Sequence, residues 1–188
     1  MAVKRITTPL TDEAVMDLKA GDSLLISGEI YTARDAAHKR LYELIENGED
    51  LPLDLQGKIF YYVGPAPAKP GQVVGSAGPT TSGRMDAYTP AMLAKGLKAS
   101  IGKGSRNDAT KKAMQQCKAV YLAATGGAGA LLAKTVKSIE PVAYEELGPE
   151  AIQRMVVEDF PATVINDAYG NDLYEEGRQK YAQRKKEA

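Results

Sequence analysis

The sequence is poor in the residues that crosslink chains or bind metal ions. Its 188 residues include one cysteine, Cys117, and one histidine, His38. A single thiol cannot form a disulfide within the chain, and it cannot alone hold a zinc ion or an iron–sulfur cluster, because such sites need about three or four protein ligands. A disulfide-stabilised scaffold is therefore excluded, and we expect Cys117 to pack as a small apolar residue.

The sequence also lacks an excess of charge and any long apolar segment. Lys and Arg number 24 and so do Asp and Glu, which gives a formal net charge of +0. The whole chain thus has no bulk attraction to nucleic acid or anionic membrane, and an anion must be bound by a few placed residues. No apolar run reaches about 18 residues, and the first residues lack the apolar segment of a signal peptide. We therefore expect a cytoplasmic protein in a reducing compartment.

The residues that are present predict one α/β domain over residues 1–188. Hydrophobic residues make up 44% of the chain, which is enough for a core. Strands are expected at Val3–Thr7, Ser23–Ile30, Lys58–Val63, Ala99–Ile101, Ala119–Ala124, Val136–Tyr144, Met155–Phe160 and Thr163–Ile165. Helices are expected from Thr11 or Asp12 to Lys19, at Arg34–Glu46, at Thr89–Lys95, from Asn107 or Asp108 to Gln116, from Ala130, and at Gly170–Lys186. This alternation favours parallel connections, with ligands bound where loops leave the carboxyl ends of strands.

Three glycine-containing loops carry a cation at predicted strand ends: Arg34, Arg84 after GPTTSG, and Lys103 within IGKG. Glycine lets the backbone approach a ligand closely, and a guanidinium can form two charge-assisted bonds to a carboxylate. The pattern suits a small anion. The alternative is that all three are solvated surface charges.

Two further residues could move a proton. Thr80 is one of three consecutive hydroxyl residues before Arg84, although an ordinary turn explains these hydroxyls equally well. A Thr hydroxyl removes a proton only where nearby cations or a base favour the alkoxide. His38 lies four residues after Arg34, on the same helix face, and is a candidate acid or base or a structural residue.

The segment Thr125-Gly126-Gly127-Ala128-Gly129 superficially suggests a nucleotide-binding loop. It has neither the G-x-G-x-x-G spacing nor the Gly-Lys-Ser/Thr ending of the phosphate loops. Tight strand-to-helix packing, or an anion at the helix N-terminus, is the favoured interpretation. The basic C-terminal end is interpreted as a solvated helix end.

Several segments together resemble the β-type subunit, or C-terminal domain, of iron–sulfur hydro-lyases such as class I fumarase and tartrate dehydratase. The matching segments, in order from about residue 5 to residue 175, are ITTPL, GDSLLISGEIYTARDAAHKRL, YYVGPAP, GPTTSGRMDAYTPAML, IGKGSRND and TGGAGALLAKTVK. The GPTTSGRMD and ARDAAHKR segments are specific. The resemblance implies a swivelling β/β/α domain, with a central mixed sheet flanked by helices, rather than a nucleotide-binding fold.

The resemblance also implies an activity: reversible addition of water across the double bond of a dicarboxylate, such as fumarate to (S)-malate. It assigns Arg34, Arg84 and Lys103 to the substrate carboxylates and Thr80 to the C3 proton, with His38 as a second candidate for proton transfer. The family's 4Fe–4S cluster uses three cysteine ligands in the other, α-type, subunit or domain. A chain that starts at Met1 with its own first strand and has only Cys117 agrees with that division. Gly83 and Ser105-Arg106 are expected to tune which diacid fits.

The resemblance predicts an αβ or (αβ)2 assembly that is active only with the α-type partner. A half-site of this kind should carry a large apolar patch beside the three cations. Tartrate and mesaconate are alternative substrate classes, and a stand-alone anion-binding or interaction module is the alternative of another kind.

Overall fold

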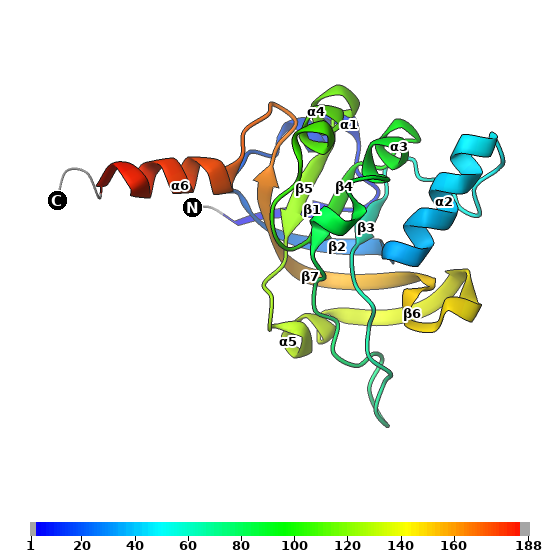
Figure 1. Ribbon diagram of the computed structural model, residues 1–188. Coiled ribbons are helices and arrows are strands. Elements are labelled where there is room, and N and C mark those ends of the chain that lie inside the picture. Colours follow the sequence, from blue (N-terminus) through cyan, green and yellow to red (C-terminus); the bar gives the residue numbers. More distant parts are fainter. Residues whose placement is uncertain (1–2, 185–188) are drawn as a thin grey trace.

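A computed structural model describes residues 3–184 and shows one seven-stranded mixed sheet (Figure 1). Its strands are β1 (Val3–Thr7), β2 (Ser23–Thr32), β3 (Ile59–Tyr61), β4 (Ala99–Gly102), β5 (Val120–Ala123), β6 (Val136–Ala143) and β7 (Ile152–Asn166). Neighbours from β1 to β5 pair in parallel, in the order of the sequence. β7 pairs antiparallel with β2, β5 and β6.

β7 closes part of this sheet into a ring. Its residue Thr163 lies opposite Ala123 of β5 on one side and opposite Ser23 of β2 on the other. Because β2, β3, β4 and β5 are paired in series, this double contact joins the two ends of the series. β1 and β6 then extend the sheet beside β2 and β7.

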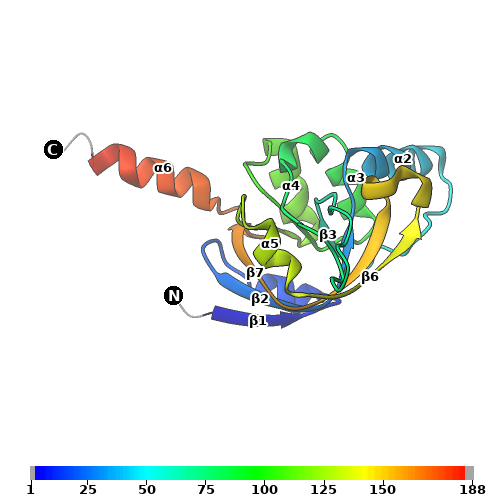
Figure 2. The same ribbon diagram turned by 90° about the horizontal axis from the view of Figure 1, so that it is seen from below.

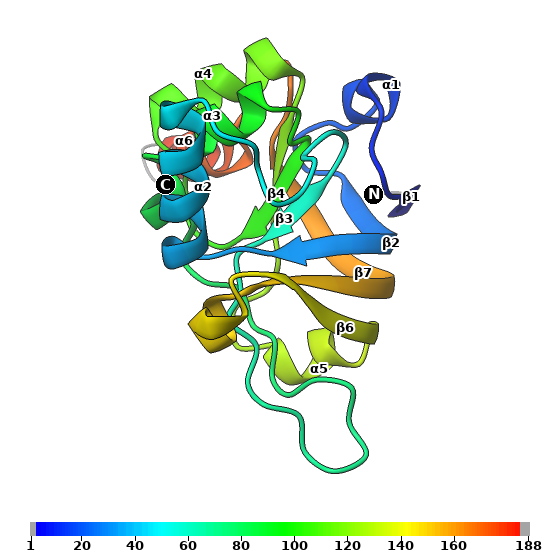
Figure 3. The same ribbon diagram turned by 90° about the vertical axis from the view of Figure 1, so that its right-hand side faces the viewer.

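The helices cover the sheet unequally. They are α1 (Asp12–Met16), α2 (Asp35–Asn47), α3 (Thr89–Ala94), α4 (Asp108–Cys117), α5 (Gly129–Ala133) and α6 (Leu173–Arg184), with short 3₁₀ turns η1 (Ser82–Met85) and η2 (Glu145–Glu150). α2, α3 and α4 lie together over one side of the strands (Figure 3). α6 projects away from the body of the molecule (Figure 2). None of the helices within residues 3–184 is long and apolar enough to cross a membrane.

Two buried clusters occupy the two faces of the central strands. Phe60 and Tyr62 belong to the cluster under α2, α3 and α4, whereas Ile59 and Tyr61 belong to the other cluster. This alternation is what a strand buried on both faces requires, since successive side chains point to opposite sides. The predicted α/β class with a central mixed sheet flanked by helices is confirmed.

Most predicted boundaries differ from the structure by no more than two residues, but those of three elements were wrong by more. The two strands expected at 155–160 and 163–165 are one strand, β7, which continues through Pro161 with an irregular register opposite Ile26 and Gly28. α1 ends at Met16 rather than Lys19. α6 begins after Asp172, whose carboxylate accepts the Tyr174 N–H, and not at Gly170. The predicted end at Lys186 lies outside the described residues.

Candidate functional site

Four loops meet at one edge of the sheet because β2, β3, β4 and β5 are parallel neighbours. Arg34 follows β2, Gly64 follows β3, Lys103 follows β4, and Gly126 follows β5. Two close contacts join these loops. A β-carbon on Gly64 would lie 2.6 Å from Arg34 Nη1, and one on Gly126 would lie 3.6 Å from Lys103 Cδ. The structure therefore brings the predicted glycine-containing loops together.

The segment around Thr80 is held between the ends of β3 and β4 by backbone bonds. The Thr80 N–H donates to the Tyr62 carbonyl over 2.7 Å, and the Lys103 N–H donates to the Thr80 carbonyl over 3.1 Å. The Ser82 N–H then donates to the Lys103 carbonyl over 2.9 Å. Thr80 and Lys103 are consequently fixed relative to each other by main-chain geometry.

Gly102 allows this segment to approach β4. A β-carbon at Gly102 would lie 2.0 Å from Ser82 Oγ, closer than two such atoms can come. The buried Ser82 hydroxyl donates to Tyr121 Oη over 2.9 Å, and the Tyr121 hydroxyl donates to the Gly104 carbonyl over 2.9 Å. The absence of a side chain at Gly102 is thus a packing requirement of the site.

Arg34 and Arg84 share one acid, Asp35. Arg84 Nε lies 2.8 Å from Asp35 Oδ1, and Arg34 Nη2 lies 3.8 Å from Asp35 Oδ2. Glu150 is a second acid beside Arg34, with Oε1 3.5 Å from Arg34 Nη2, and its Oε2 accepts the Ala36 N–H at the start of α2. The two arginines predicted from separate loops are therefore neighbours around a common carboxylate.

The three cations differ in how much of their charge is already paired. The Arg34 side chain is 22% exposed and lies beside two acids, whereas the Arg84 side chain is 53% exposed and has one ion-pair partner. Lys103 is exposed, and its ammonium forms no ion pair with any residue that the structure describes. Arg34 Nε and Asp35 Oδ2 are buried and have no hydrogen-bond partner within residues 3–184. Buried polar atoms without a protein partner are few in native proteins, and a bound ligand or a water molecule can satisfy them.

Thr80 is half-buried, and its hydroxyl makes no hydrogen bond to the described residues. It stands next to Thr81, which forms a β-bridge with Lys103. A hydroxyl so placed is available to a ligand held by the neighbouring cation. Whether it acts as a base stays a prediction.

His38 lies near the start of α2, and its side chain is buried in the core. Its side chain is 0% exposed, and its ring centroid lies 5.5 Å from that of Phe60 and 5.2 Å from that of Tyr62. Nδ1 donates to the Arg34 carbonyl over 3.0 Å, while Nε2 is buried without a partner among the described residues. Burial lowers the pKa of His38 to about 4, so the ring is neutral near pH 7. His38 therefore touches the site through the backbone of Arg34, and its role in proton transfer stays a prediction.

Sequence analysis missed the role of Asp86 and misplaced Arg106. The Arg106 side chain is buried, with Nε 2.6 Å from Asp86 Oδ1, Nη1 2.9 Å from Ser100 Oγ and Nη2 2.7 Å from Thr89 Oγ1. Such a guanidinium is saturated from inside the protein, so Arg106 is not a ligand contact at the exposed edge where Lys103 lies. No spacing within one segment signals this pair, because Asp86 and Arg106 come from different loops.

An apolar hollow of about 300 Å³ lies beside Arg34. Its lining residues are mostly small and apolar, and they come from the loop after β3, from β6, from η2 and from the start of β7: Pro65, Ala66, Pro67, Ala68, Val73, Val74, Ile139, Gly148, Pro149 and Gln153. The loop starts at Gly64, which contacts Arg34, and reaches away from the body (Figure 3). The predicted large apolar patch has this hollow as its best location.

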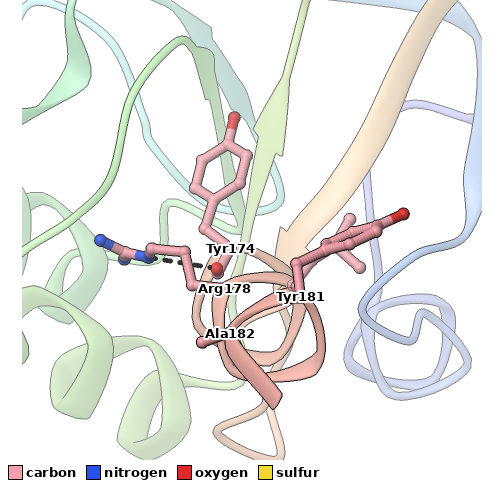
Figure 4. Close-up of a pocket in the computed structure, with 6 residues that line it drawn as sticks. Tyr174, Arg178, Tyr181 and Ala182 are labelled. Carbon is pink, nitrogen blue, oxygen red and sulfur yellow. Dashed lines mark hydrogen bonds between the residues drawn. The ribbon is translucent and has the colours of Figure 1, made fainter. Parts of the chain in front are cut away.

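A wider hollow of about 460 Å³ lies on α6, where Tyr174, Arg178 and Tyr181 line it (Figure 4). Arg178 Nε donates to the Tyr174 carbonyl there over 3.2 Å. α6 and α2 lie at opposite ends of the molecule (Figure 1). The α6 hollow is therefore separate from the loops that carry the cations.

The described residues do not form a metal centre. Within residues 3–184 no group of three or more His, Cys, Asp or Glu side chains could hold a metal ion. Cys117, at the end of α4, is half-buried and reduced. A cluster with three cysteine ligands does not fit these residues.

Comparison with known proteins places these features in a family. The sequence matches the family described as Fumarase C-terminus over residues 2–177. It is 42% identical over 155 residues to fumarate hydratase class I, aerobic, of Escherichia coli strain K12, covering 81% of this chain and 28% of that protein. It is 41% identical over 177 residues to the putative L(+)-tartrate dehydratase subunit beta of Methanocaldococcus jannaschii, covering 91% of each chain. A putative fumarate hydratase class I of Geobacillus stearothermophilus is 40% identical over 176 residues, which is 33% of its length. The chain thus spans about a third or less of these fumarate hydratases and nearly all of the tartrate dehydratase subunit.

Proposed function

The chain belongs to the fumarase C-terminus family, and from that premise we propose that it is the β subunit of a two-subunit hydro-lyase that converts fumarate reversibly to (S)-malate. The observation that carries this proposal is the convergence of Arg34, Arg84, Lys103 and Thr80 at the carboxyl ends of β2, β3 and β4. Three cations and one unpaired hydroxyl match what a dicarboxylate and its proton chemistry need.

The cations bind the substrate carboxylates. Arg84 and Lys103 are the exposed charges and make the principal contacts, and Arg34 contributes from a more buried position. A guanidinium forks onto a carboxylate, whereas an ammonium acts as a point charge. Addition of water to the double bond develops negative charge beside one carboxylate, and cations already in place stabilise that charge without reorganising.

Thr80 transfers the C3 proton in this proposal. A free Thr hydroxyl is a poor base near neutral pH, so the alkoxide must be favoured by a nearby positive charge. Lys103 is bound to the Thr80 segment through two backbone hydrogen bonds, to Thr80 and to Ser82. His38 is the second candidate for proton transfer, but the neutral buried ring would have to act through Arg34.

The partner is a cluster-bearing α-type subunit in an αβ or (αβ)2 assembly. Two observations support this. The described residues offer no site for the 4Fe–4S cluster expected of the family, and the match to a relative named as a subunit beta covers 91% of that relative. The apolar hollow beside Arg34 is the proposed contact surface.

L(+)-Tartrate is the second candidate substrate. It is favoured by the match to the tartrate dehydratase subunit, which covers 91% of each chain. Diacids that differ by a hydroxyl are separated by about 1–3 kcal/mol of contacts in the pocket unless the pocket hydrogen-bonds that hydroxyl.

Co-purification under anaerobic conditions with an α-type subunit of the family, followed by hydratase assays, tests the proposal. We expect turnover of fumarate and malate by the complex and none by this chain alone. Turnover of tartrate in preference to fumarate would move the assignment to the second candidate. Full activity of the isolated chain would contradict its proposed role as one subunit of two. No association with the α-type subunit would contradict that role as well, and it would favour a stand-alone anion-binding module.

A further inference from the structure

Asp35 connects two arginines that come from different loops. It is the first residue of α2, directly after Arg34, while Arg84 belongs to η1, 49 residues further along the chain. The Arg84 Nε–H donates to Asp35 Oδ1 over 2.8 Å, and Asp35 Oδ2 faces Arg34 Nη2 at 3.8 Å. The Asp35 side chain is 31% exposed, so this contact lies at the rim of the site rather than in the core.

The bond to Asp35 uses only one edge of the Arg84 guanidinium. Nη1 and Nη2 make no hydrogen bond within residues 3–184, and the side chain is 53% exposed. Two terminal nitrogens with their N–H bonds in one plane are the edge that can fork onto a carboxylate. An exposed arginine otherwise samples many rotamers, and ordering it on binding costs free energy.

A purely structural role for Asp35 is the alternative. An acid in the first turn of a helix stabilises it through the helix dipole, by about 0.3–1 kcal/mol. The contacts of the Asp35 side chain do not favour this alternative as its main role, because they are with arginines, while the Ala36 N–H of the same turn donates to Glu150 instead.

We propose that Asp35 is a positioning residue: it holds Arg84 by Nε so that the two terminal nitrogens face the substrate carboxylate. This inference rests on the proposed function, in which Arg84 binds that carboxylate. Glu150 supports the arrangement from the other side, by holding Arg34 and the first turn of α2.

A double-mutant cycle in the assembled αβ enzyme tests this inference. Arg84→Ala should lower kcat/KM by about 100-fold. Asp35→Ala should lower it by about tenfold, mainly through KM, because the arginine remains but is no longer ordered. The double variant should lie near the 100-fold loss of Arg84→Ala, with at most a small further loss through Arg34, which Asp35 also faces at 3.8 Å. Asp35→Asn keeps an acceptor for Nε and should stay within about threefold of the wild type.

Asp108→Ala is the matched control. Asp108 is the first residue of α4, as Asp35 is of α2, and its side chain is 97% exposed in a pair with Lys111. Its loss removes a first-turn acid of the same kind at a distance from the arginines, and it should leave KM unchanged.

Different outcomes separate this inference from the proposed function. If Arg84→Ala retains wild-type kinetics, the carboxylate-binding role of Arg84 fails and the positioning role fails with it. If Arg84→Ala is impaired but Asp35→Ala is not, or if their effects multiply to about 1,000-fold, only the positioning role is overturned.

A second measurement needs no activity. In the full chain labelled with ¹⁵N, the Arg84 Nε–H resonance should shift in Asp35→Asn and keep its position in Asp108→Ala. An unchanged Arg84 resonance in Asp35→Asn would also overturn the inference.

Discussion

The Arg106 guanidinium and the Asp86 carboxylate form an ion pair inside the protein: Nε lies 2.6 Å from Oδ1, and the Arg106 side chain is 0% exposed. Asp86 Oδ2 also accepts the Asn107 N–H over 2.8 Å. Arg84 lies two residues before Asp86, and Lys103 lies three residues before Arg106. The pair therefore ties together the two loops that carry the exposed cations.

Loss of the Asp86 carboxylate should destabilise the fold strongly. Asp86→Ala leaves the Arg106 cation buried without its partner, which costs about 3–5 kcal/mol in comparable buried pairs. Urea unfolding measures this free energy. Glu158→Ala, in an exposed pair with Lys137, should cost less than about 1 kcal/mol. Equal effects of the two variants would show that the interior pair does not hold the loops together.

Removal of the Arg84 guanidinium should impair catalysis in the αβ complex by about 100-fold in kcat/KM, because a placed charge is lost where negative charge develops. Steady-state assays with fumarate measure the change. Arg5→Ala is the control, since Arg5 lies on edge strand β1, is exposed and pairs with Asp159 of β7. Arg84→Lys should recover only part of the loss, because an ammonium cannot fork. Near-wild-type turnover by Arg84→Ala would contradict the assignment.

Replacement of Thr80 separates proton transfer from substrate positioning. Thr80→Val keeps the shape and removes the hydroxyl, so turnover should fall while the diacid still binds. Thr80→Ser restores a hydroxyl and should recover activity. Binding measured by calorimetry and turnover measured by absorbance distinguish the two steps. Loss of binding with unchanged kcat would mean that Thr80 positions the substrate.

Titration of His38 should make stability depend on pH. Burial lowers the pKa of His38 from 6.5 in the unfolded chain to about 4 in the folded protein. The unfolded state therefore binds the extra proton first, so this contribution is complete above pH 6.5 and is lost as the pH falls to about 4. It amounts to about 3 kcal/mol. Urea unfolding measures the free energy of unfolding at pH 7 and at pH 4.5. Between these two pH values the wild type should lose more of this free energy than His38→Gln does, by nearly this amount. Equal losses in the two proteins would contradict the prediction.

A side chain at position 102 should displace the segment that carries Thr80. Gly102→Ala places a β-carbon where Ser82 Oγ lies, so the Thr80–Ser82 segment must move, with a cost of about 1–3 kcal/mol. Activity of the complex should fall with stability. Gly83→Ala is the control for stability, because Gly83 directly follows Ser82 in η1 and the nearest neighbour of its β-carbon would be 3.7 Å away. Ser82→Ala combined with Gly102→Ala should restore part of the stability, and no recovery would mean that the clash lies elsewhere.

Much of the candidate site was predictable from local pattern. Arg34 and Lys103 each follow a β-prone segment, and parallel strands place their carboxyl ends at one edge. Asn107 and Thr11 were recognisable helix caps, and their side chains accept the N–H groups of Thr110 and Ala14. The element boundaries that failed, at α1, β7 and α6, depend on packing and on turns rather than on hydrophobic periodicity.

The sequence by itself determined the elements, their alternation and the residue types available at the strand ends, because these follow from hydrophobic spacing, glycine placement and the single cysteine. Only the tertiary structure decided that β7 closes the strand ring, that Asp35 joins Arg34 to Arg84, and that Arg106 is buried against Asp86. Each of these contacts joins residues far apart along the chain. Spacing within one segment carries no information about such contacts, since they form only when the sheet has brought the loops together.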